Sequence, residues 1–374
     1  MIHYDLNLPE ILQYVTGRDQ SLFATDLQRN EAQLRTEIEG KSVLVIGGAG
    51  TIGSSFVKQL LPYQPARVLV MDNNENELTE LVRDIRSQPE TTPPEELLTL
   101  PMDFADSIAL KLISHEGPFD VVANFAALKH VRSEKNAYCS AYMVKNNILK
   151  ARALLELLRD QPPRHFFCVS TDKAAEPVNL MGATKKLMEE LVLGYAHWIP
   201  ATTARFANVA FSNGSLLDGF LKRLAKHQPL AAPSDVRRFF VSPDESGQLC
   251  LLACILGGPG DIFVPKLDSR HDTKRFSDIA VKLLESLGMQ AEVCSSEAQA
   301  RERARQRDGN YPCYFFESDT TGEKPCEQFW TEDEVVDHES YSGLSVVRYA
   351  SPVDMLRVSK TLEQLEAMIE GEDI

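Results

Sequence analysis

The chain has 374 residues, of which 43% are hydrophobic and 25% charged, and its formal net charge is −15. This length and apolar content suffice for one large domain or two closely joined ones, and no segment has the low complexity of a disordered tail. The acidic balance excludes nucleic acid as the expected partner, because phosphate backbones are bound by clustered Lys and Arg.

Neither a signal peptide nor a membrane span is predicted, since no run approaches the ~18 apolar residues that cross a bilayer. The seven cysteines form no CxxC pair and have no histidine at a metal-ligand spacing. Cys250 and Cys254 lie four residues apart in an apolar helical run, which predicts buried thiols. We therefore expect a cytoplasmic protein that uses neither a membrane nor a metal.

Residues 1–40 have helical patterns without evident chemistry, and a regular alternation begins at Lys41. Apolar, β-branched runs predict strands at 42–46, 66–71, 96–100, 119–124, 165–170 and 202–206. Amphipathic segments between them predict helices near 51–61, 75–87, 106–115, 141–159 and 182–196. Strands separated by helices form parallel βαβ units, so the predicted fold class is α/β with a doubly wound parallel sheet.

The alternation ends after residue 207. The remainder predicts a turn at 212–215, a strand at 261–264, a strand-like run at 311–316, and helices near 215–227, 244–256, 277–288 and the C-terminus. A polar stretch rich in Arg, Glu and Gln precedes residue 311. We predict an N-terminal helical segment (1–40), a dinucleotide-binding domain (41–207), and a smaller α/β substrate-binding region with a tail (208–374).

The first predicted strand runs directly into the sequence GGAGTIG, with glycines at positions 47, 50 and 53. Gly47 permits a tight turn, and Gly50 lets the backbone approach a pyrophosphate at the N-terminus of the next helix. Gly53 completes the pattern. Asp72, nineteen residues after Gly53, ends the second strand and is placed to accept hydrogen bonds from the adenosine ribose.

Asp72 also indicates which dinucleotide is bound. A carboxylate there would repel a 2′-phosphate, and no Arg or Lys follows before Arg83, which favours NAD over NADP. The third strand is followed by Asp103, placed to meet the adenine, and the fourth leads into small residues beside a flat ring. The predicted cofactor-binding residues are Gly47, Gly50, Thr51, Ile52, Gly53, Asp72, Asp103, Phe104, Ala126 and Lys185.

The fifth strand leads into VSTDKAAEPVNLMGATKK, residues 169–186. With GGAGTIG, NFAALKHV, RFANV, SNGS and RRFF, this run resembles the polysaccharide-biosynthesis branch of the extended short-chain dehydrogenases, whose characterised members are UDP-N-acetylglucosamine 4,6-dehydratases. The resemblance is strong over 41–265 and weaker through a late GEK segment. It implies a Rossmann fold, NAD as cofactor and a UDP-linked amino sugar as substrate.

The family reaction has three stages. The 4-hydroxyl of the sugar is oxidised, water is eliminated across carbons 5 and 6, and the hydride returns to carbon 6. By resemblance, Thr171 contacts the 4-oxygen, Asp172 is the acid at the 6-hydroxyl and Lys173 is the base at carbon 5. Consecutive residues at the carboxyl end of a central strand suit this task, because open α/β sheets place their sites there. A surface ion pair of Asp172 with Lys173 is the alternative.

Lys185 stands four residues after the position where the wider family has the Tyr of a YxxxK motif, and is expected to hold the nicotinamide ribose. Met181 occupies the Tyr position here, and a thioether cannot take a proton. Membrane-anchored members of the branch carry Met at this position and retain configuration at carbon 5. The chain is therefore similar to the catalytic part of the Met type.

Further substrate-binding residues are inferred from position. Lys129 and His130 follow the fourth strand, where substrate contact and a solvated loop are both open. By resemblance, Asn208, Ser212 and Asn213 grip the sugar nucleotide and Arg238 pairs with the diphosphate, for which a forked guanidinium is suited. Substrate-binding residues are thus Lys129, His130, Met181, Asn208, Ser212, Asn213 and Arg238. Thr320 replaces an Arg of relatives.

Two other functions stay open. A 4-epimerase on the same scaffold needs no carbon 5 base and usually has the Tyr, so Asp172, Lys173 and Met181 favour the dehydratase. A non-catalytic NAD-binding scaffold is disfavoured because Thr171 and Lys185 are also present. We further expect a homo-oligomer, formed through residues 1–40 or the helices of the cofactor domain.

Overall fold

The computed structural model describes residues 7–89, 92–306, 309–318, 327–349 and 353–371. The chain forms two compact units, each assembled from separate segments. The larger unit comprises residues 22–206, 244–266 and 328–374, and the smaller comprises residues 1–21, 207–243 and 267–327. The chain therefore leaves the larger unit twice and returns twice.

The larger unit is built on a nine-stranded sheet in the order β14-β15-β10-β6-β5-β4-β1-β2-β3. Its strands are β1 (Ser42–Ile46), β2 (Arg67–Asp72), β3 (Glu96–Pro101), β4 (Val121–Asn124), β5 (His165–Val169), β6 (Ala201–Ala204), β10 (Ile262–Pro265), β14 (Val335–Asp337) and β15 (Leu344–Arg348). The strands from β3 to β10 pair in parallel, and β15 and β14 add an antiparallel edge. The strand order reverses at β1, which lies between β4 and β2.

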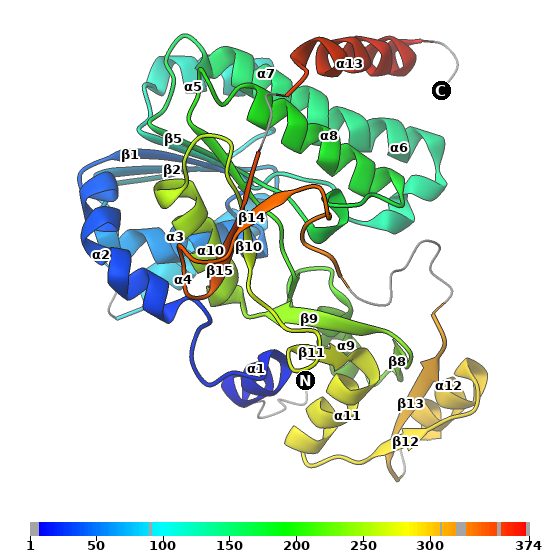
Figure 1. The fold of residues 1–374 in the computed structure, drawn as a ribbon. Helices are drawn as coiled ribbons and strands as arrows, with labels where there is room; N and C mark the ends of the chain where they lie inside the picture. Colours follow the sequence, from blue (N-terminus) through cyan, green and yellow to red (C-terminus); the bar gives the residue numbers. More distant parts are fainter. Residues whose placement is uncertain (1–6, 90–91, 307–308, 319–326, 350–352, 372–374) are drawn as a thin grey trace. The chain divides into compact units, whose positions relative to one another are not determined.

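Helices cover both faces of this sheet (Figure 1). They are α2 (Ala24–Ile38), α3 (Thr51–Leu60), α4 (Glu75–Ser87), α5 (Ser107–Glu116), α6 (Ala137–Val144), α7 (Lys150–Leu158), α8 (Leu180–Gly194), α10 (Pro243–Leu256) and α13 (Met355–Glu370). Short turns of helix are η1 (Leu61–Tyr63), η2 (Val131–Lys135) and η4 (Asp172–Ala174), and a π-helical turn, η3 (Lys145–Leu149), joins α6 to α7.

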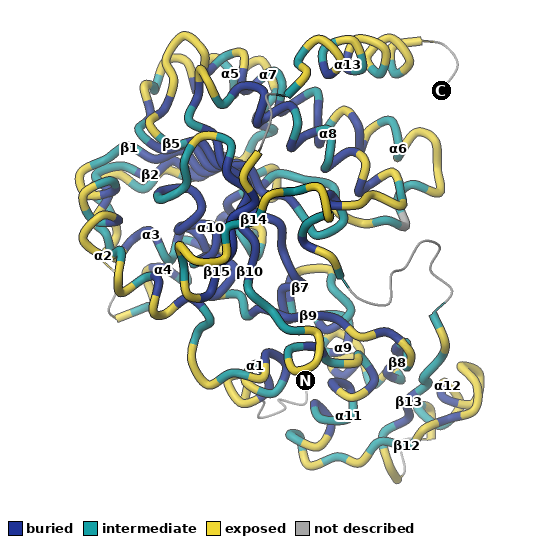
Figure 2. Tube along the Cα trace, in the orientation of Figure 1, coloured by how far each residue is buried: buried dark blue, intermediate teal, exposed yellow. Residues whose placement is uncertain are grey.

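Alternating strand residues build the core of the larger unit. Leu44 and Ile46 of β1 join a buried cluster with α5, α7, α8 and α13, whereas Val43 and Val45, equally buried, point to the opposite face. Figure 2 shows the central strands buried and the outer helix faces exposed. Strands that are buried on both faces have continuous apolar sequences, which is why the sequence predicted them. The predicted doubly wound α/β fold is confirmed.

The smaller unit has two three-stranded sheets, β11-β9-β7 and β12-β13-β8. Its elements are α1 (Leu8–Thr16), β7 (Asn208–Val209), α9 (Leu216–Ala225), β8 (Leu230–Pro233), β9 (Arg237–Val241), β11 (Thr273–Arg275), α11 (Phe276–Ser286), β12 (Ala291–Val293), α12 (Glu297–Gln306) and β13 (Tyr311–Phe316). Apolar residues of α1, α9 and α11 form its core together with β8, including Ile11, Phe220 and Leu283.

The observed units differ from the predicted division into 1–40, 41–207 and 208–374. The change of unit after Phe206 lies beside the predicted boundary at 207, but residues 244–266 and 328–374 return to the larger unit. They do so because β10 pairs with β6, and β15 then pairs with β10. The N-terminal helices also divide, with α1 in the smaller unit and α2 in the larger.

In the part of the chain that the structure describes, no helix is both long enough and apolar enough to cross a membrane. The predicted burial of Cys250 and Cys254 in α10 is confirmed, with exposed fractions of 0% and 1%. The polar stretch before residue 311 forms helix α12, although its sequence pattern predicted neither a helix nor a strand.

Candidate active site

The glycine-rich turn connects β1 to α3 at the point where the strand order reverses. Gly47 has a φ of +70°, and a Cβ there would lie 2.6 Å from the backbone nitrogen of Ala126. A Cβ on Gly53 would collide with the carbonyl oxygen of Gly47. The packing of the chain on itself therefore explains glycine at positions 47 and 53.

Gly50 is different. Its φ of −66° suits any residue, and the nearest atom to an added Cβ is the Gly47 carbonyl oxygen, 3.6 Å away. Gly50 is also the N-cap of α3, whose first turn begins with Thr51 and Ile52 and has no acidic side chain. Nothing described within the protein demands glycine there, so the open backbone suits an anionic group approaching the helix N-terminus.

Asp72 lies against this turn. Its Oδ2 accepts a hydrogen bond from the backbone nitrogen of Ala49 at 3.1 Å, and its Oδ1 accepts one from Asn74 at 2.9 Å. Each carboxylate oxygen can accept a second hydrogen bond, which is what recognition of ribose hydroxyls requires. The side chain is thus fixed in direction while it keeps accepting capacity.

Asp103 has a partner that the sequence reading did not foresee. Its carboxylate pairs with the ammonium group of Lys150 in α7 and accepts from the backbone nitrogen of Ala105 at 3.0 Å. Burial alone would raise the pKa of Asp103, but the hydrogen bonds from Lys150 and Ala105 outweigh it and lower the pKa. The neighbouring Phe104 is 5% exposed. Adenine contact by these residues stays a prediction.

Thr171, Asp172 and Lys173 leave the carboxyl end of β5 and form the start of the turn η4. The Thr171 hydroxyl donates to Asp172 Oδ1 at 2.7 Å, and Lys173 Nζ lies 3.3 and 3.4 Å from the two Asp172 oxygens. The Asp172 side chain is 10% exposed and that of Lys173 is 38% exposed. The three groups form one hydrogen-bonded set that a ligand can reach through Lys173.

Helix α8 packs directly against the turn formed by Asp172 and Lys173. Asn179 caps the helix by accepting from the backbone nitrogen of Gly182 at 2.8 Å. A Cβ on Gly182 would lie only 2.7 Å from the carbonyl oxygen of Lys173, so glycine allows the helix to pack directly against the Asp172–Lys173 turn. The sequence GATK therefore sets the position of the candidate catalytic groups.

Met181 and Lys185 lie one helical turn apart in α8 and are 3% and 4% exposed. Lys185 Nζ donates to the carbonyl oxygen of Val169, the last residue of β5, at 3.0 Å. Burial lowers the pKa of Lys185, and the nearby Cys168 and Glu189 oppose this shift. The backbone nitrogen of Met181 donates to a carboxylate oxygen of Glu134 at 3.2 Å.

Lys129 and His130 lie on an exposed stretch between β4 and η2. Loss of hydration around the ring, and then the positive charge of Lys129, lower the pKa of His130. Asn147 of the π-helical turn supports the stretch: its side chain accepts from the Leu128 nitrogen at 2.8 Å and donates to the Leu128 carbonyl oxygen at 3.0 Å. Sequence analysis missed Asn147, which is buried although its neighbours Lys145, Asn146 and Lys150 make the segment polar.

The remaining predicted contacts lie in the smaller unit. The side-chain nitrogen of Asn208 donates to the Phe239 carbonyl oxygen at 3.2 Å and to Glu327. Ser212 is 8% exposed, and Asn213 is exposed in the turn that precedes α9. Arg238 lies in β9, is 9% exposed, and donates to the carbonyl oxygen of Arg237 at 2.8 Å.

Thr320 and the GEK segment lie outside the described residues. Within the described ranges, no group of three or more His, Cys, Asp or Glu side chains could hold a metal ion.

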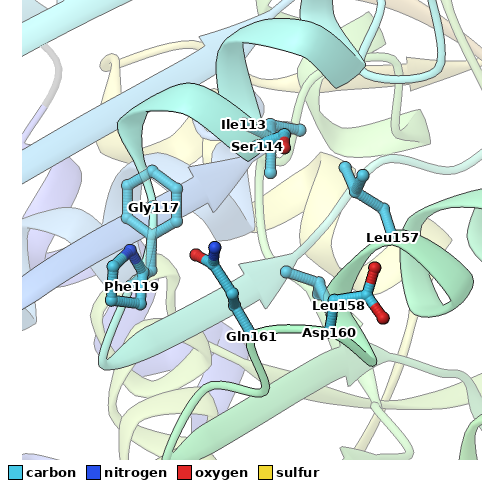
Figure 3. A pocket seen from close by; sticks show the side chains of 9 residues that line it. Ile113, Ser114, Gly117, Phe119, Leu157, Leu158, Asp160 and Gln161 are labelled. Carbon is cyan, nitrogen blue, oxygen red and sulfur yellow. The ribbon is translucent and has the colours of Figure 1, made fainter.

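A small pocket of about 110 Å³ opens elsewhere on the larger unit (Figure 3). Its lining comes from the end of α5, the loop before β4, and the end of α7 with the residues that follow it, including Phe119 and Gln161. This is the amino end of β4, whereas the candidate catalytic residues follow the carboxyl end of β5. None of the predicted site residues lines the pocket.

Comparison with known proteins identifies the family. The model of the polysaccharide biosynthesis protein family matches residues 43–348. The chain therefore belongs to this family. It is 35% identical over 254 residues to MJ1061 of Methanocaldococcus jannaschii, which is named an uncharacterized membrane protein. The match covers 66% of this chain and 72% of MJ1061.

Relatives with named activities are more distant. The chain is 28% identical over 253 residues to an inverting UDP-N-acetylglucosamine 4,6-dehydratase of Campylobacter jejuni, covering 65% of this chain and 72% of that one. It is 29% identical over 237 residues to a UDP-glucose 4-epimerase of Rickettsia massiliae, covering 60% and 66%. The match spans only 43% of EpsC of Bacillus subtilis, a probable polysaccharide biosynthesis protein.

Solved structures share the fold. Pen from Bacillus thuringiensis superimposes with a TM-score of 0.67 at 22% identity, over 84% of this chain and 89% of that one. The dTDP-glucose 4,6-dehydratase DesIV from Streptomyces venezuelae, solved with NAD bound, superimposes with a TM-score of 0.59 at 21% identity, over 77% and 88%.

Proposed function

We propose that the protein binds NAD and converts UDP-N-acetylglucosamine to the UDP-linked 4-keto-6-deoxy sugar, with retention at carbon 5, for the synthesis of surface polysaccharides or glycans. The observation that carries the proposal is the hydrogen-bonded set of Thr171, Asp172 and Lys173 at the carboxyl end of β5. Relatives named 4,6-dehydratase and polysaccharide biosynthesis protein support it.

The residues of the β1–α3 turn fit the cofactor. Gly50 leaves its backbone open at a helix N-terminus, and Asp72 keeps two carboxylate oxygens able to accept further bonds. The Asp72 carboxylate favours NAD over NADP, because it would lie against a 2′-phosphate. When bound, NAD would accept the hydride of carbon 4 and supply it again to carbon 6.

The proton transfers at carbons 5 and 6 are assigned to the chain itself. Thr171 Oγ1 contacts the 4-oxygen, and the proton of the 4-hydroxyl passes to solvent as carbon 4 is oxidised. Lys173 Nζ takes the proton from carbon 5, and Asp172 gives its proton to the 6-hydroxyl, which leaves as water. Once the hydride has returned to carbon 6, Lys173 gives its proton back to carbon 5 and Asp172 regains one from solvent. Lys173 Nζ lies 3.3 and 3.4 Å from the two Asp172 oxygens, so the base and the acid lie side by side.

The buried Met181 supports the retaining dehydratase. A phenol at this position would be a second proton carrier close to the cofactor-binding lysine, as in ordinary members of the wider family. The thioether removes that carrier, so proton transfer is left to the Thr171–Asp172–Lys173 set. A 4-epimerase has no use for a carbon 5 base, which is why we place that function second.

The test is direct. The protein is incubated with NAD and UDP-N-acetylglucosamine, and the products are weighed by mass spectrometry. The proposal predicts a nucleotide sugar lighter than the substrate by one water. A product of unchanged mass with inverted carbon 4 would identify an epimerase, and no conversion of this or other UDP-linked hexosamines would favour a non-catalytic protein.

A further inference from the structure

Arg205 is the largest fully buried side chain of the structure described, with an exposed fraction of 0%. Nε and Nη2 donate to the two oxygens of Glu189 at 2.9 Å each. Nη1 and Nη2 donate to the two oxygens of Glu334 at 2.7 Å each, and Nη1 also donates to the Phe329 carbonyl oxygen at 2.8 Å. All five N–H groups of the guanidinium are therefore used.

One arm of this cluster reaches the catalytic turn. Glu189 of α8 is fully buried, and its Oε1 also accepts from the Ser170 hydroxyl at 2.5 Å. Ser170 directly precedes Thr171. Glu189 also lies one helical turn after Lys185 in α8, so its carboxylate connects the residue after β5 to the helix that carries Met181 and Lys185.

The other arm reaches residues 328–337, which we call the return segment because the chain re-enters the larger unit there. Glu334 accepts from Arg205 and also from the backbone nitrogen of Thr331 at 3.0 Å. Burial would raise the pKa of Glu334, but the contacts with Arg205 outweigh it and lower the pKa. The return segment then continues into β14 of the large sheet.

The charges of the cluster balance. Lys186 Nζ lies 3.6 Å from Glu334 and 4.0 Å from Glu189, so two cations face two carboxylates. A buried cluster of this kind is a poor source of net stability, because desolvation offsets the attraction. Its directional, bidentate hydrogen bonds are a good means of fixing geometry.

We propose that Arg205 is a positioning residue: through Glu189 and Ser170 it holds the Thr171–Lys173 turn in its reactive geometry, and through Glu334 it makes that geometry depend on the docked return segment. This role rests on the proposed dehydratase chemistry. It predicts that a change at the return segment is felt at the catalytic turn, although no catalytic group has been altered.

The first test needs no substrate. In the full-length protein, Glu334→Gln is expected to speed amide hydrogen exchange both in the return segment and in residues 170–175, whereas Ser170→Ala speeds it in residues 170–175 alone. Thr202→Val is the matched control, because it removes another buried hydroxyl bond, to the Ala253 carbonyl oxygen at 2.9 Å, outside the cluster. Leu362→Ala destabilises the same unit away from the cluster, and therefore measures how much general destabilisation alone speeds amide exchange.

The second test is kinetic. Ser170→Ala and Glu334→Gln are each expected to lower kcat about tenfold with KM changed less than about twofold, because the loss is one of alignment rather than binding. The double variant should also lose about tenfold, since both changes interrupt one connection, whereas independent effects would multiply to about a hundredfold. Thr202→Val should keep its kcat.

The proposal would be overturned if Glu334→Gln speeds exchange beyond the level seen in Leu362→Ala only in the return segment, and not in residues 170–175. So would a hundredfold loss in the double variant. A wild-type protein that eliminates no water from UDP-N-acetylglucosamine would refute the proposed function instead, and the exchange measurement would still decide the role of Arg205.

Discussion

At the scale of single residues, the proposed mechanism divides the proton chemistry between two neighbours, Lys173 as the base and Asp172 as the acid. Lys173 is more than a third exposed and Asp172 is largely buried, so the base can reach a ligand while the acid lies beside it. Met181 and Lys185 are both buried in α8, and none of the hydrogen bonds described joins either side chain to Asp172. Separate substitutions should therefore separate the individual proton transfers.

Lys173→Ala should slow deprotonation at carbon 5, because it removes the proposed base. We expect a loss of dehydration of about 10²- to 10⁴-fold, the usual contribution of a general base. Asp172→Asn should stall later, so that no water leaves but the carbon 5 proton still exchanges with heavy water. Deuterium incorporation followed by NMR distinguishes the variants, and near-normal dehydration by Lys173→Ala would place the base elsewhere.

These residues were predicted from the resemblance of the segment VSTDKAAEPVNLMGATKK to the dehydratase family, supported by their position at a strand end. The sequence did not reveal their supports. Asn147, Glu189 and Glu334 act through contacts with residues far along the chain, and a buried carboxylate in a helix looks like any exposed one until its partner is known. The contact of Asp103 with Lys150 was missed for the same reason.

At the scale of elements, the β1–α3 turn contains two glycines that the fold requires, Gly47 and Gly53, and a third, Gly50, that we expect a bound cofactor to require. Gly53→Ala should destabilise the protein strongly, because its Cβ would collide with the Gly47 carbonyl oxygen. Gly50→Ala should unfold at nearly the wild-type temperature but bind NAD at least tenfold more weakly, since only a bound group would meet its Cβ. Thermal unfolding and NAD titration measure both; unchanged NAD affinity in Gly50→Ala would contradict this account.

Helix α13 offers a second matched pair. Leu362 is 1% exposed and packs into the core cluster of the larger unit, whereas Leu356 is 82% exposed on the same helix. Leu362→Ala should lower the free energy of unfolding by about 2–5 kcal/mol, and Leu356→Ala should change it by less than about 0.5 kcal/mol. Denaturant titration compares them, and equal effects would mean that α13 does not dock as described.

The strand–helix alternation up to residue 206 was predictable because buried parallel strands are continuous apolar runs. The strands β7, β8, β9, β11, β12, β14 and β15 were not predicted. Outside the regular alternation, two to five residues carry too little pattern to predict a pairing with a distant part of the chain. The predicted helix near 141–159 contains the π-helical turn η3, which the spacing of apolar residues in this segment does not predict.

At the scale of the whole molecule, the chain order conceals the two units. The sequence shows where the regular alternation stops, near residue 207, but not that residues 244–266 and 328–374 complete the first sheet. Such returns depend on which free strand edge is available, and a local pattern contains no record of that edge. The linear division into three parts was therefore an oversimplification of the units observed.

Self-association is the expectation for the whole molecule. Tyr138 and Tyr142 of α6, one helical turn apart, are 70% and 50% exposed, and tyrosine is enriched at interfaces between protein chains. We expect a homo-oligomer by light scattering at micromolar concentration, and a shift toward monomer in the variant Tyr138→Glu, Tyr142→Glu. Leu356→Glu, on the exposed side of α13, is the control. A wild-type monomer at all concentrations would contradict the expectation.

The most direct test of the central claim follows a label through the reaction. UDP-N-acetylglucosamine deuterated at carbon 4 is incubated with the protein and NAD, and the product is examined by mass spectrometry and NMR. The account predicts a 4-keto product that has lost one water and carries the deuterium at carbon 6. Deuterium returned to carbon 4 in a product of unchanged mass, or retained in unconverted substrate, would contradict it.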